Sequence, residues 1–314
     1  MPSFSSSMKQ AKEDIRSQPE VIVHTVILAI TTVLALIGNS FVCLAFYRNR
    51  RLRTITNYYV LSLAVADIIL ATFSPFHVIA SGLRRWPFDQ NVCQFLGFLV
   101  HLWAQVSLST LTLASVNRYF CVVKPHKYPL FFGKKKTILS ILFLWILLFL
   151  HTLIFTIVTP IFYRWSPKSL YCQGTSFDGQ TDRISYIFFG CFFILPVTSL
   201  VFCYGSVYRV VRRHNSAIVP SLQDANALGT ITAQEIKASR LLFVTVFGFC
   251  VCWTPLIGLF VLVFGFQVFI SSVALWVFVL LSTFSSWINP VIYGVMNRAM
   301  RKEFCNILFC RKVD

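Results

Sequence analysis

The sequence predicts an all-α membrane protein, a seven-transmembrane helix bundle that ends in a short amphipathic helix. Hydrophobic residues make up 56% of the 314 residues and charged residues only 12%, about half of the usual globular share. This composition excludes an ordinary soluble enzyme, a disordered chain and a coiled coil. The charges are confined to short bursts, and only Asp67 interrupts the stretch 54–83. Stretches without any charge are residues 25–47, 90–117, 137–163, 184–208 and 241–297.

These stretches suffice for seven membrane crossings, because a helix needs about 20 apolar residues to span a bilayer and the last stretch holds two crossings. A membrane β-barrel is disfavoured because its alternating segments of about ten residues are absent. We expect an outer N-terminus over 1–22, a seven-transmembrane domain over 23–295, and a cytoplasmic amphipathic helix and tail over 296–314. The spans are expected at about 23–48, 56–82, 90–123, 136–160, 184–212, 234–264 and 270–294.

The distribution of Lys and Arg predicts the orientation of these spans. The loops on one side, together with the C-terminal tail, carry 20 of the 28 Lys and Arg residues, and the other side carries 8. The basic side is expected in the cytoplasm, which places the N-terminus outside and the C-terminus inside a multi-pass protein of the plasma membrane. Since the charges flank the spans, they indicate contact with anionic membrane lipids and not with nucleic acid.

Short motifs follow one another along the predicted spans. In order they are Gly38-Asn39, Leu63-Ala64-Val65-Ala66-Asp67, Asn117-Arg118-Tyr119, Trp145, Pro196 with Tyr204, Cys252-Trp253-Thr254-Pro255 and Asn289-Pro290-Val291-Ile292-Tyr293. The ordered set, over about residues 22–310, resembles that of the rhodopsin-like (class A) G-protein-coupled receptors.

The resemblance implies a receptor and not an enzyme. Such a receptor binds an extracellular ligand, moves span 6 outward and activates a heterotrimeric G protein. Arrestin and a receptor kinase are further partners that the resemblance implies. No cofactor is expected, apart from a sodium ion as an allosteric ligand.

Asp67 is the acidic residue deep in a span, where a charge is costly without a partner. In the family the matching carboxylate binds sodium, and hydroxyl and amide oxygens suit such a hard cation. The alternative is a protonated Asp67 that hydrogen-bonds to Asn39 and Asn289. The residues implied at the sodium site are Asp67, Ser107, Trp253 as a floor, Ser285 and Asn289.

The switch residues implied by the resemblance are spread over the inner halves of the spans. Arg118 follows Asn117, where the family usually has an acidic residue, so Glu235 remains as the partner that would tie span 3 to span 6. The alternative is that Arg118 and Glu235 are separately solvated. Proline kinks a helix because it removes a backbone hydrogen bond. The full set is Asn117, Arg118, Tyr119, Tyr204, Glu235, Pro255, Pro290 and Tyr293.

Four of the ten cysteines are assigned a role. Cys93, at the outer end of span 3, and Cys172, in the second outer loop, are the two expected outside the cell, where oxidising conditions favour a disulfide between them. Cys305 and Cys310 lie in the inner tail beside basic and apolar residues, which predicts palmitoylation of one or both. Free cytosolic thiols are the alternative.

The ligand pocket is placed by the resemblance. Its wall is aromatic with a few neutral polar groups, which suits a lipophilic or uncharged small molecule. Val100 stands where aminergic receptors carry Asp, and Thr283 stands where opsins carry the retinal-binding Lys, so neither ligand class is expected. The implied pocket residues are His77, Val100, His101, Ala104, Gln105, His151, Phe188, Phe189, Phe192, Trp253, Leu256, Ile257, Phe260, Val279 and Thr283.

Within the family, the chain is similar to the melatonin receptors in Asn117-Arg118-Tyr119 and in Cys93-Gln94-x-x-Gly97-Phe98. It departs from them at Pro290, where they have Ala, and at Phe192, where they have His. Two other classes stay as alternatives. A multi-pass transporter would show broken helices in two related halves, and a membrane enzyme would need clustered acids, histidines or metal ligands.

Overall fold

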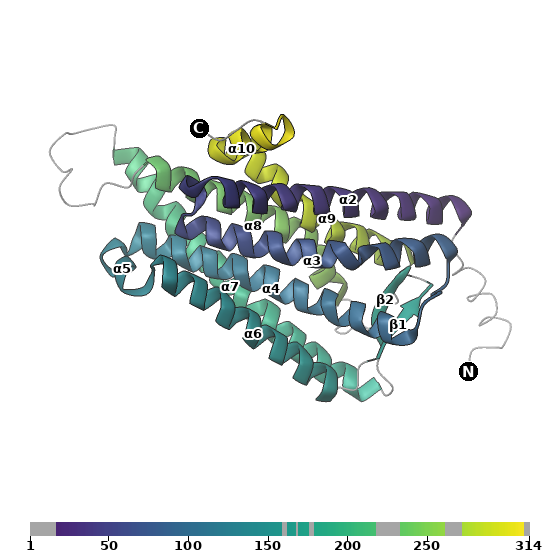
Figure 1. Cartoon of the computed structure of the whole chain (residues 1–314). Helices are drawn as coiled ribbons and strands as arrows, with labels where there is room; N and C mark the ends of the chain where they lie inside the picture. The colour runs from purple at the N-terminus through teal and green to yellow at the C-terminus, as the bar shows by residue number, and fades with distance from the viewer. Residues whose placement is uncertain are drawn as a thin grey trace.

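The computed structural model describes residues 17–158, 162–167, 169–175, 179–217, 233–260 and 272–310. Seven helices are long and apolar enough to cross a membrane, which confirms the expected seven-helix bundle. They are α2 (Gln18–Arg48), α3 (Ile55–Leu83), α4 (Gln90–Val123), α6 (Lys134–Val158), α7 (Gly179–Ala217), α8 (Ala233–Phe260) and α9 (Ser272–Met296). A short helix, α10 (Arg298–Leu308), follows α9 and lies beside one end of the bundle (Figure 1).

Polar side chains mark where several of these helices begin. At the start of α4, the Asp89 side chain accepts a hydrogen bond from the Asn91 N–H (2.8 Å). Thr54 caps α3 in the same way, and Asn297 caps α10. A side-chain oxygen at this position satisfies an N–H that has no partner inside the helix. The loop residues therefore define where each apolar helix starts.

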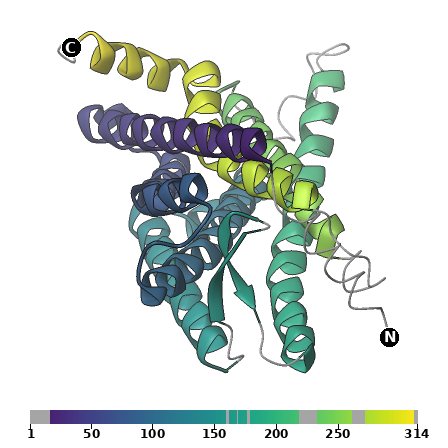
Figure 2. The same ribbon diagram turned by 90° about the vertical axis from the view of Figure 1, so that its right-hand side faces the viewer.

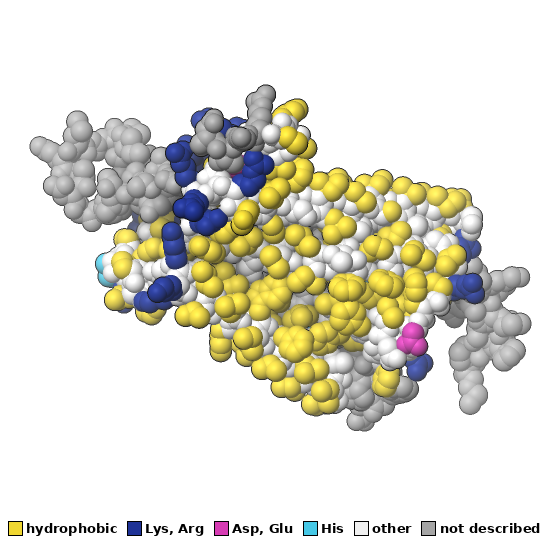
Figure 3. Space-filling view, in the orientation of Figure 1, with side chains coloured by type: hydrophobic (Ala, Val, Ile, Leu, Met, Phe, Trp, Pro, Cys, Tyr) yellow, Lys and Arg dark blue, Asp and Glu magenta, His cyan; other side chains and the backbone are white. Residues whose placement is uncertain are grey.

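Apolar side chains cover much of the outside of the bundle (Figure 3). On α6, for example, Leu139, Phe143 and Ile157 are 65–70% exposed. A surface of this kind is unfavourable in water, whereas in a bilayer it faces the lipid chains. Lys and Arg side chains gather at the end that carries α10, as Figure 3 also shows.

The buried core has two parts. One centres on α4 and joins it to α3 and α8, with members that include Tyr59, Trp103, Leu108, Leu111, Phe249 and Trp253. The other joins α2, α3, α9 and α10, with members that include Val42, Val60, Tyr293 and Met300. Because Met300 is only 1% exposed, α10 belongs to the packed structure and is not a loose tail.

Helices α2 and α9 are in close contact at a glycine. A Cβ atom on Gly38 would lie 2.9 Å from the Cβ of Pro290 and 3.0 Å from its Cγ. Protein interiors are packed too densely to absorb such an overlap without a shift of one element. The space beside Pro290, which lies inside α9, therefore requires glycine at position 38.

A β-hairpin that the sequence did not predict lies at the other end of the bundle from α10 (Figures 1 and 2). Its strands, β1 (Phe162–Ser166) and β2 (Tyr171–Thr175), are antiparallel, and Trp165 pairs with Cys172. A disulfide joins Cys172 to Cys93 of α4, with 5.7 Å between the Cα atoms, as expected. The hairpin is thus fixed to the first turn of α4.

Candidate functional site

Asp67 lies in the middle of the bundle, on α3, and is 1% exposed. The indole Nε1 of Trp103 donates a hydrogen bond to its Oδ1 (2.8 Å), and the Nδ2 of Asn289 donates to its Oδ2 (3.4 Å). The carboxylate therefore receives an N–H on each oxygen, from α4 and from α9. Such bonds offset much of the cost of burying an acidic group.

Trp103 is a contact of Asp67 that the sequence analysis missed. A signal was present, because Trp103 precedes Ser107 by four residues, and positions i and i+4 share one face of a helix. Since Ser107 is expected near Asp67, Trp103 is expected on the same face of the helix, one turn toward its N-terminus. What the sequence could not show is that its N–H, and not its ring, meets the carboxylate.

Other members of the implied sodium site surround this pair. Trp253 Nε1 donates to Ser285 Oγ (3.3 Å), which in turn donates to the backbone oxygen of Ser282 (2.6 Å). The buried Ser107 Oγ has no hydrogen-bond partner among the residues that the structure describes. An unsatisfied buried hydroxyl is uncommon in folded proteins, so Ser107 Oγ is available as a ligand or hydrogen-bonding atom.

Asn39 takes part in the same region without contacting Asp67 directly. Its Nδ2 donates to the backbone oxygens of Ala35 (2.9 Å) and Ser286 (3.0 Å). Asn39 thereby ties α2 to α9, next to the Gly38–Pro290 contact. Of the two partners expected for a protonated Asp67, Asn289 makes the hydrogen bond and Asn39 makes these backbone contacts instead.

An aromatic column continues from Asp67 into α8. The ring centroids of Trp103 and Trp253 are 5.7 Å apart, and Phe249 stacks on Trp253 at 5.4 Å. Pro255 lies inside α8 two residues after Trp253, where it removes a backbone hydrogen bond. A displacement of Trp253 can therefore be transmitted along a helix that already has a weak point.

Near the C-terminal end of α4, Arg118 is 5% exposed. It donates to the Oδ1 of its neighbour Asn117 (2.9 Å) and to the hydroxyl of Thr56 on α3. Asn117 in turn donates to the hydroxyl of Tyr128 (3.2 Å). The amide oxygen of Asn117 thus accepts a hydrogen bond from Arg118, as an acidic side chain at this position would. The side chain of Glu235, at the start of α8, lies outside the described residues.

The two switch tyrosines are buried next to this region. Tyr204 is 9% exposed and Tyr293 is 1% exposed, and neither hydroxyl has a hydrogen-bond partner within the described part of the chain. Tyr119 instead packs near Phe202 of α7, with 5.6 Å between ring centroids.

Four of the predicted pocket residues make contacts in the half of the bundle that carries the hairpin. His151 Nδ1 lies 3.0 Å from Gln105 Oε1, which joins α6 to α4. His101 Nδ1 lies 3.2 Å from the hydroxyl of Tyr163 in β1. His77 of α3 stacks on Tyr171 of β2, with 3.8 Å between ring centroids and 5° between planes. One hairpin tyrosine thus covers a ring face of His77, and the other hydrogen-bonds to the ring nitrogen of His101.

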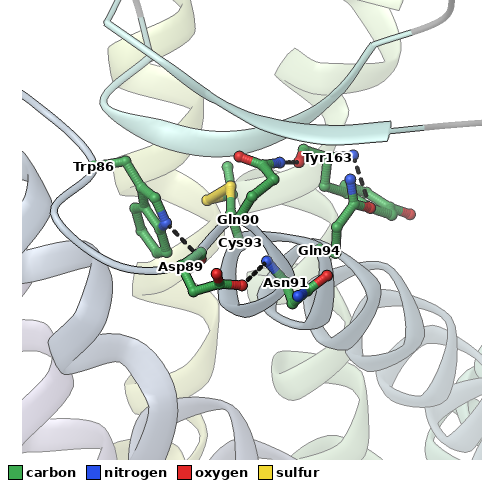
Figure 4. The surroundings of a disulfide bond; sticks show 8 residues. Trp86, Asp89, Gln90, Asn91, Cys93, Gln94 and Tyr163 are labelled. Atoms are coloured by element: carbon green, nitrogen blue, oxygen red, sulfur yellow. Dashed lines mark hydrogen bonds between the residues drawn. A yellow bond between two sulfur atoms is a disulfide. The ribbon is translucent and has the colours of Figure 1, made fainter.

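Tyr163 was not predicted, and it is held firmly. Its N–H donates to Gln94 Oε1 (3.1 Å) and its carbonyl accepts from Gln90 Nε2 (2.7 Å), as Figure 4 shows beside the disulfide. The residues of α4 that face the hairpin recur every three or four positions, which is the spacing of one helix face. They are Gln90, Cys93, Gln94, Gly97 and His101.

The remaining pocket predictions divide into two groups. Ala104 and Val279 are buried, and Val100 and Thr283 are partly buried, with Thr283 donating to the Leu280 carbonyl (2.9 Å). The other predicted residues lie in α7 and α8, but their side chains fall outside those that the structure describes. They are Phe188, Phe189, Phe192, Leu256, Ile257 and Phe260.

The two cysteines predicted to carry lipid are exposed at the end of α10. Cys305 and Cys310 are both accessible, and the neighbouring Leu308 and Phe309 are 62% and 67% exposed. Toward the bundle, α10 presents Glu303, whose Oε1 accepts a hydrogen bond from Asn49 Nδ2 (2.8 Å). The helix therefore has one face fixed to the protein and a second, apolar face beside both thiols.

Seven apolar helices around a buried polar centre, with a disulfide-fixed hairpin over one end, define a seven-helix membrane receptor. The sequence profile of the family described as "7 transmembrane receptor (rhodopsin family)" matches residues 38–293. The chain belongs to this family.

Similar proteins agree with this assignment. The chain is 30% identical over 293 residues to melatonin receptor type 1C of Gallus gallus, covering 90% of this chain and 80% of that receptor. It is 26% identical over 323 residues to octopamine receptor beta-2R of Chilo suppressalis, covering 91% and 80%. The crystal structure of squid rhodopsin has the same fold, with a TM-score of 0.79 at 22% identity, covering 95% of this chain and 89% of that one.

The family defines the function in general terms. The protein is a G-protein-coupled receptor, a multi-pass signal transducer of the plasma membrane, and not an enzyme. Coupling to G proteins follows from the family. Neither the transporter nor the membrane-enzyme alternative is favoured, and the expected similarity to melatonin receptors is confirmed.

Proposed function

We propose that the ligand is a small, uncharged or lipophilic molecule bound in the outer half of the bundle, between α4 and α6 and beneath the hairpin. The pair of Gln105 with His151 is the observation that carries this proposal, because it offers neutral hydrogen-bonding groups from two helices. Buried neutral groups of this kind bind a ligand more tightly when it hydrogen-bonds to them, and they bind a ligand with an unpaired charge more weakly.

Two ligands after which the similar receptors are named, melatonin and octopamine, give a direct test. Both would be applied to membranes that contain the receptor and co-expressed G proteins, with guanine-nucleotide exchange as the readout. We expect melatonin or a similar uncharged compound to stimulate exchange and protonated octopamine to be inactive. Stimulation by octopamine alone would contradict the proposal.

A substitution links the response to the proposed pocket. Gln105→Ala removes the hydrogen-bond partner of His151 and is expected to lower agonist potency about fivefold to tenfold, the effect of about 1 kcal/mol. Thr72→Ala is the control, since Thr72 is exposed on α3 and bonds only its own helix. Equal potencies for the two variants would remove Gln105 from the ligand site.

Activation proceeds, in this proposal, by outward movement of the cytoplasmic half of α8. Agonist shifts the population toward the open form because it binds that form more tightly. Arg118 then exchanges its contacts with Asn117 and Thr56 for the G protein, and Tyr204 and Tyr293 turn toward each other. Arrestin and a receptor kinase would recognise the same opened face.

Glu235 is proposed as the acidic partner of Arg118 in the inactive form. An ion pair between α4 and α8 would hold the cytoplasmic end closed. Glu235→Ala is therefore expected to raise nucleotide exchange in the absence of ligand. Unchanged basal exchange in this variant would remove Glu235 from the mechanism.

A sodium ion is proposed as an allosteric ligand of Asp67. Ser107, Ser285 and Asn289 would supply further oxygens, above a floor formed by Trp253. Agonist affinity should be lower in sodium chloride than in an equal concentration of the chloride salt of a bulky organic cation. Asp67→Asn should abolish this difference. An affinity that does not depend on sodium in the unmodified receptor would reject the site.

Orientation and lipid attachment complete the proposal. The N-terminus is placed outside the cell and the C-terminus inside, so an epitope tag before Gln18 should be reached by antibody on intact cells and a tag after Asp314 should not. Cys305 and Cys310 are proposed as palmitoylation sites, since a thioester there would anchor the apolar end of α10. Acyl exchange with a biotin reagent should label the receptor and fail on the double Ser variant.

A further inference from the structure

A crevice with an entirely apolar lining opens between α3, α4 and α6. About 270 Å³ of unfilled space lies in and directly outside this crevice, because it is open toward the outside of the bundle, and no polar atom is exposed in it. Its floor is made of buried side chains and its walls of partly exposed ones. The floor consists of Ala66, Trp103 and Val106, and the walls include Leu70, Leu102 and Trp145.

The crevice belongs to the surface that faces lipid. Ile69, at its edge, is 37% exposed, and Ile146 beside Trp145 is 60% exposed. Ala66, Trp103 and Trp145 each lie near the middle of the helix that carries them. In a bilayer with a hydrocarbon core of about 30 Å, the crevice is therefore close to the midplane, about 15 Å from either headgroup layer.

The polar atoms near the crevice are already used. Trp145 Nε1 donates to Ser62 Oγ (3.0 Å) and Trp103 Nε1 donates to Asp67 Oδ1 (2.8 Å). An occupant is therefore offered no hydrogen-bond donor, and a polar group placed here would lose its own partners. A hydrocarbon group is therefore the occupant that suits both the apolar lining of the crevice and its depth in the bilayer.

We propose that this crevice binds the end of an acyl chain of a membrane phospholipid. The glycerol end of the same lipid would stay at the headgroup layer, which the depth requires. A bound chain would fill the space against the indole of Trp103, so lipid would press on one face of the side chain whose N–H holds Asp67. The crevice thus connects the bilayer to the polar centre through a single residue.

The test uses the full receptor in lipid nanodiscs that contain a phosphatidylcholine with a photoreactive diazirine. In one preparation the diazirine is at the end of an acyl chain, and in a second it is next to the glycerol. After irradiation, mass spectrometry maps the labelled residues. We expect the chain-end probe to label Leu102 and its neighbours severalfold more than Ile146, and the glycerol-end probe to leave them unlabelled.

A pair of variants sharpens the assignment. Leu102→Trp places a larger side chain in the crevice and should suppress its labelling, whereas Ile146→Trp, on the open surface of α6, should not. The proposal is overturned if chain-end labelling of the crevice only equals that of Ile146. It is also overturned if a photoreactive sterol labels the crevice more strongly than the phospholipid does. None of these readouts requires a ligand or a G protein.

Discussion

The ring of Tyr163 occupies the place where a side chain on Gly97 would lie. A Cβ atom added to Gly97 would overlap the Cγ and Cδ1 atoms of that ring. The contact seats the hairpin on α4 one turn below the disulfide, and it carries the Tyr163 hydroxyl to His101. The absence of one methyl group on α4 thus determines what covers the outer half of the bundle.

Gly97→Ala should displace Tyr163 and loosen the hairpin. Forcing extra volume into a packed contact costs about 1–3 kcal/mol, so we expect a lower thermal transition and weaker ligand retention. Gly205→Ala is the matched control, because a Cβ there meets nothing within 4 Å and alanine favours a helix. If both variants melted alike, the contact with Tyr163 would have no energetic role.

Removal of the Tyr163 hydroxyl should have a defined pH signature. Burial raises the pKa of Tyr163 to about 12, above the usual value of about 10. A group whose pKa is higher in the folded state contributes its full stabilisation of the fold at pH values below its unfolded pKa. For Tyr163 this contribution is lost as the pH rises from about 10 through 12. The difference in thermal transition temperature between the unmodified receptor and the Tyr163→Phe variant should be constant from about pH 6 to 9 and should change above about pH 10. A change confined to the neutral range would point to another group.

Trp103→Phe should destabilise the receptor more than Trp145→Phe. Each change removes one indole N–H, but Trp103 donates to the carboxylate of Asp67 and Trp145 to the hydroxyl of Ser62. Hydrogen bonds to charged groups contribute about 1.5–3 kcal/mol and neutral ones about 0.5–1.5 kcal/mol. Unfolding of the two purified variants measures this order directly. The reverse order would indicate that Asp67 is protonated in the folded receptor.

Asn117→Asp should lower ligand-independent nucleotide exchange. A carboxylate at this position would accept a charge-assisted hydrogen bond from Arg118, roughly twice as strong as the bond to the amide. Asn117→Ala removes the acceptor and should raise basal exchange. Tyr128→Phe, which keeps the Arg118 bond and loses the 3.2 Å bond from Asn117, should have the smaller effect. Higher basal exchange in the Asp variant would show that Asn117 does not restrain Arg118.

The sequence predicted the bundle because the membrane imposes a simple rule on composition. A span must be about 20 residues long and nearly free of charge, so the stretches without Asp, Glu, Lys or Arg mark the helices without reference to their contacts. The same rule made Asp67 conspicuous. The order of the motifs also assigned Arg118, Tyr204 and Tyr293 to particular helices, because each belongs to a short pattern within one helix.

Apart from the Cys93–Cys172 disulfide and the contact of Asp67 with Asn289, which were expected, contacts between elements far apart in the chain could not be obtained in this way. Tyr163 meets Gly97 only after the hairpin folds over α4, and although the aromatic residues of β1 favour a strand, they do not indicate which helix it covers. Trp103 reads as one more apolar residue of a span until α3 brings Asp67 within hydrogen-bond distance of its indole.

The sequence alone therefore determined how many helices cross the membrane and which polar residues they carry, since both depend on the transfer of individual side chains into lipid. The tertiary structure decided which of those polar groups meet: Trp103 and Asn289 at Asp67, Asn117 at Arg118, and Tyr163 at His101. The reason is physical, because a hydrogen bond depends on distance and direction to within a few tenths of an ångström, and only the packed bundle fixes these.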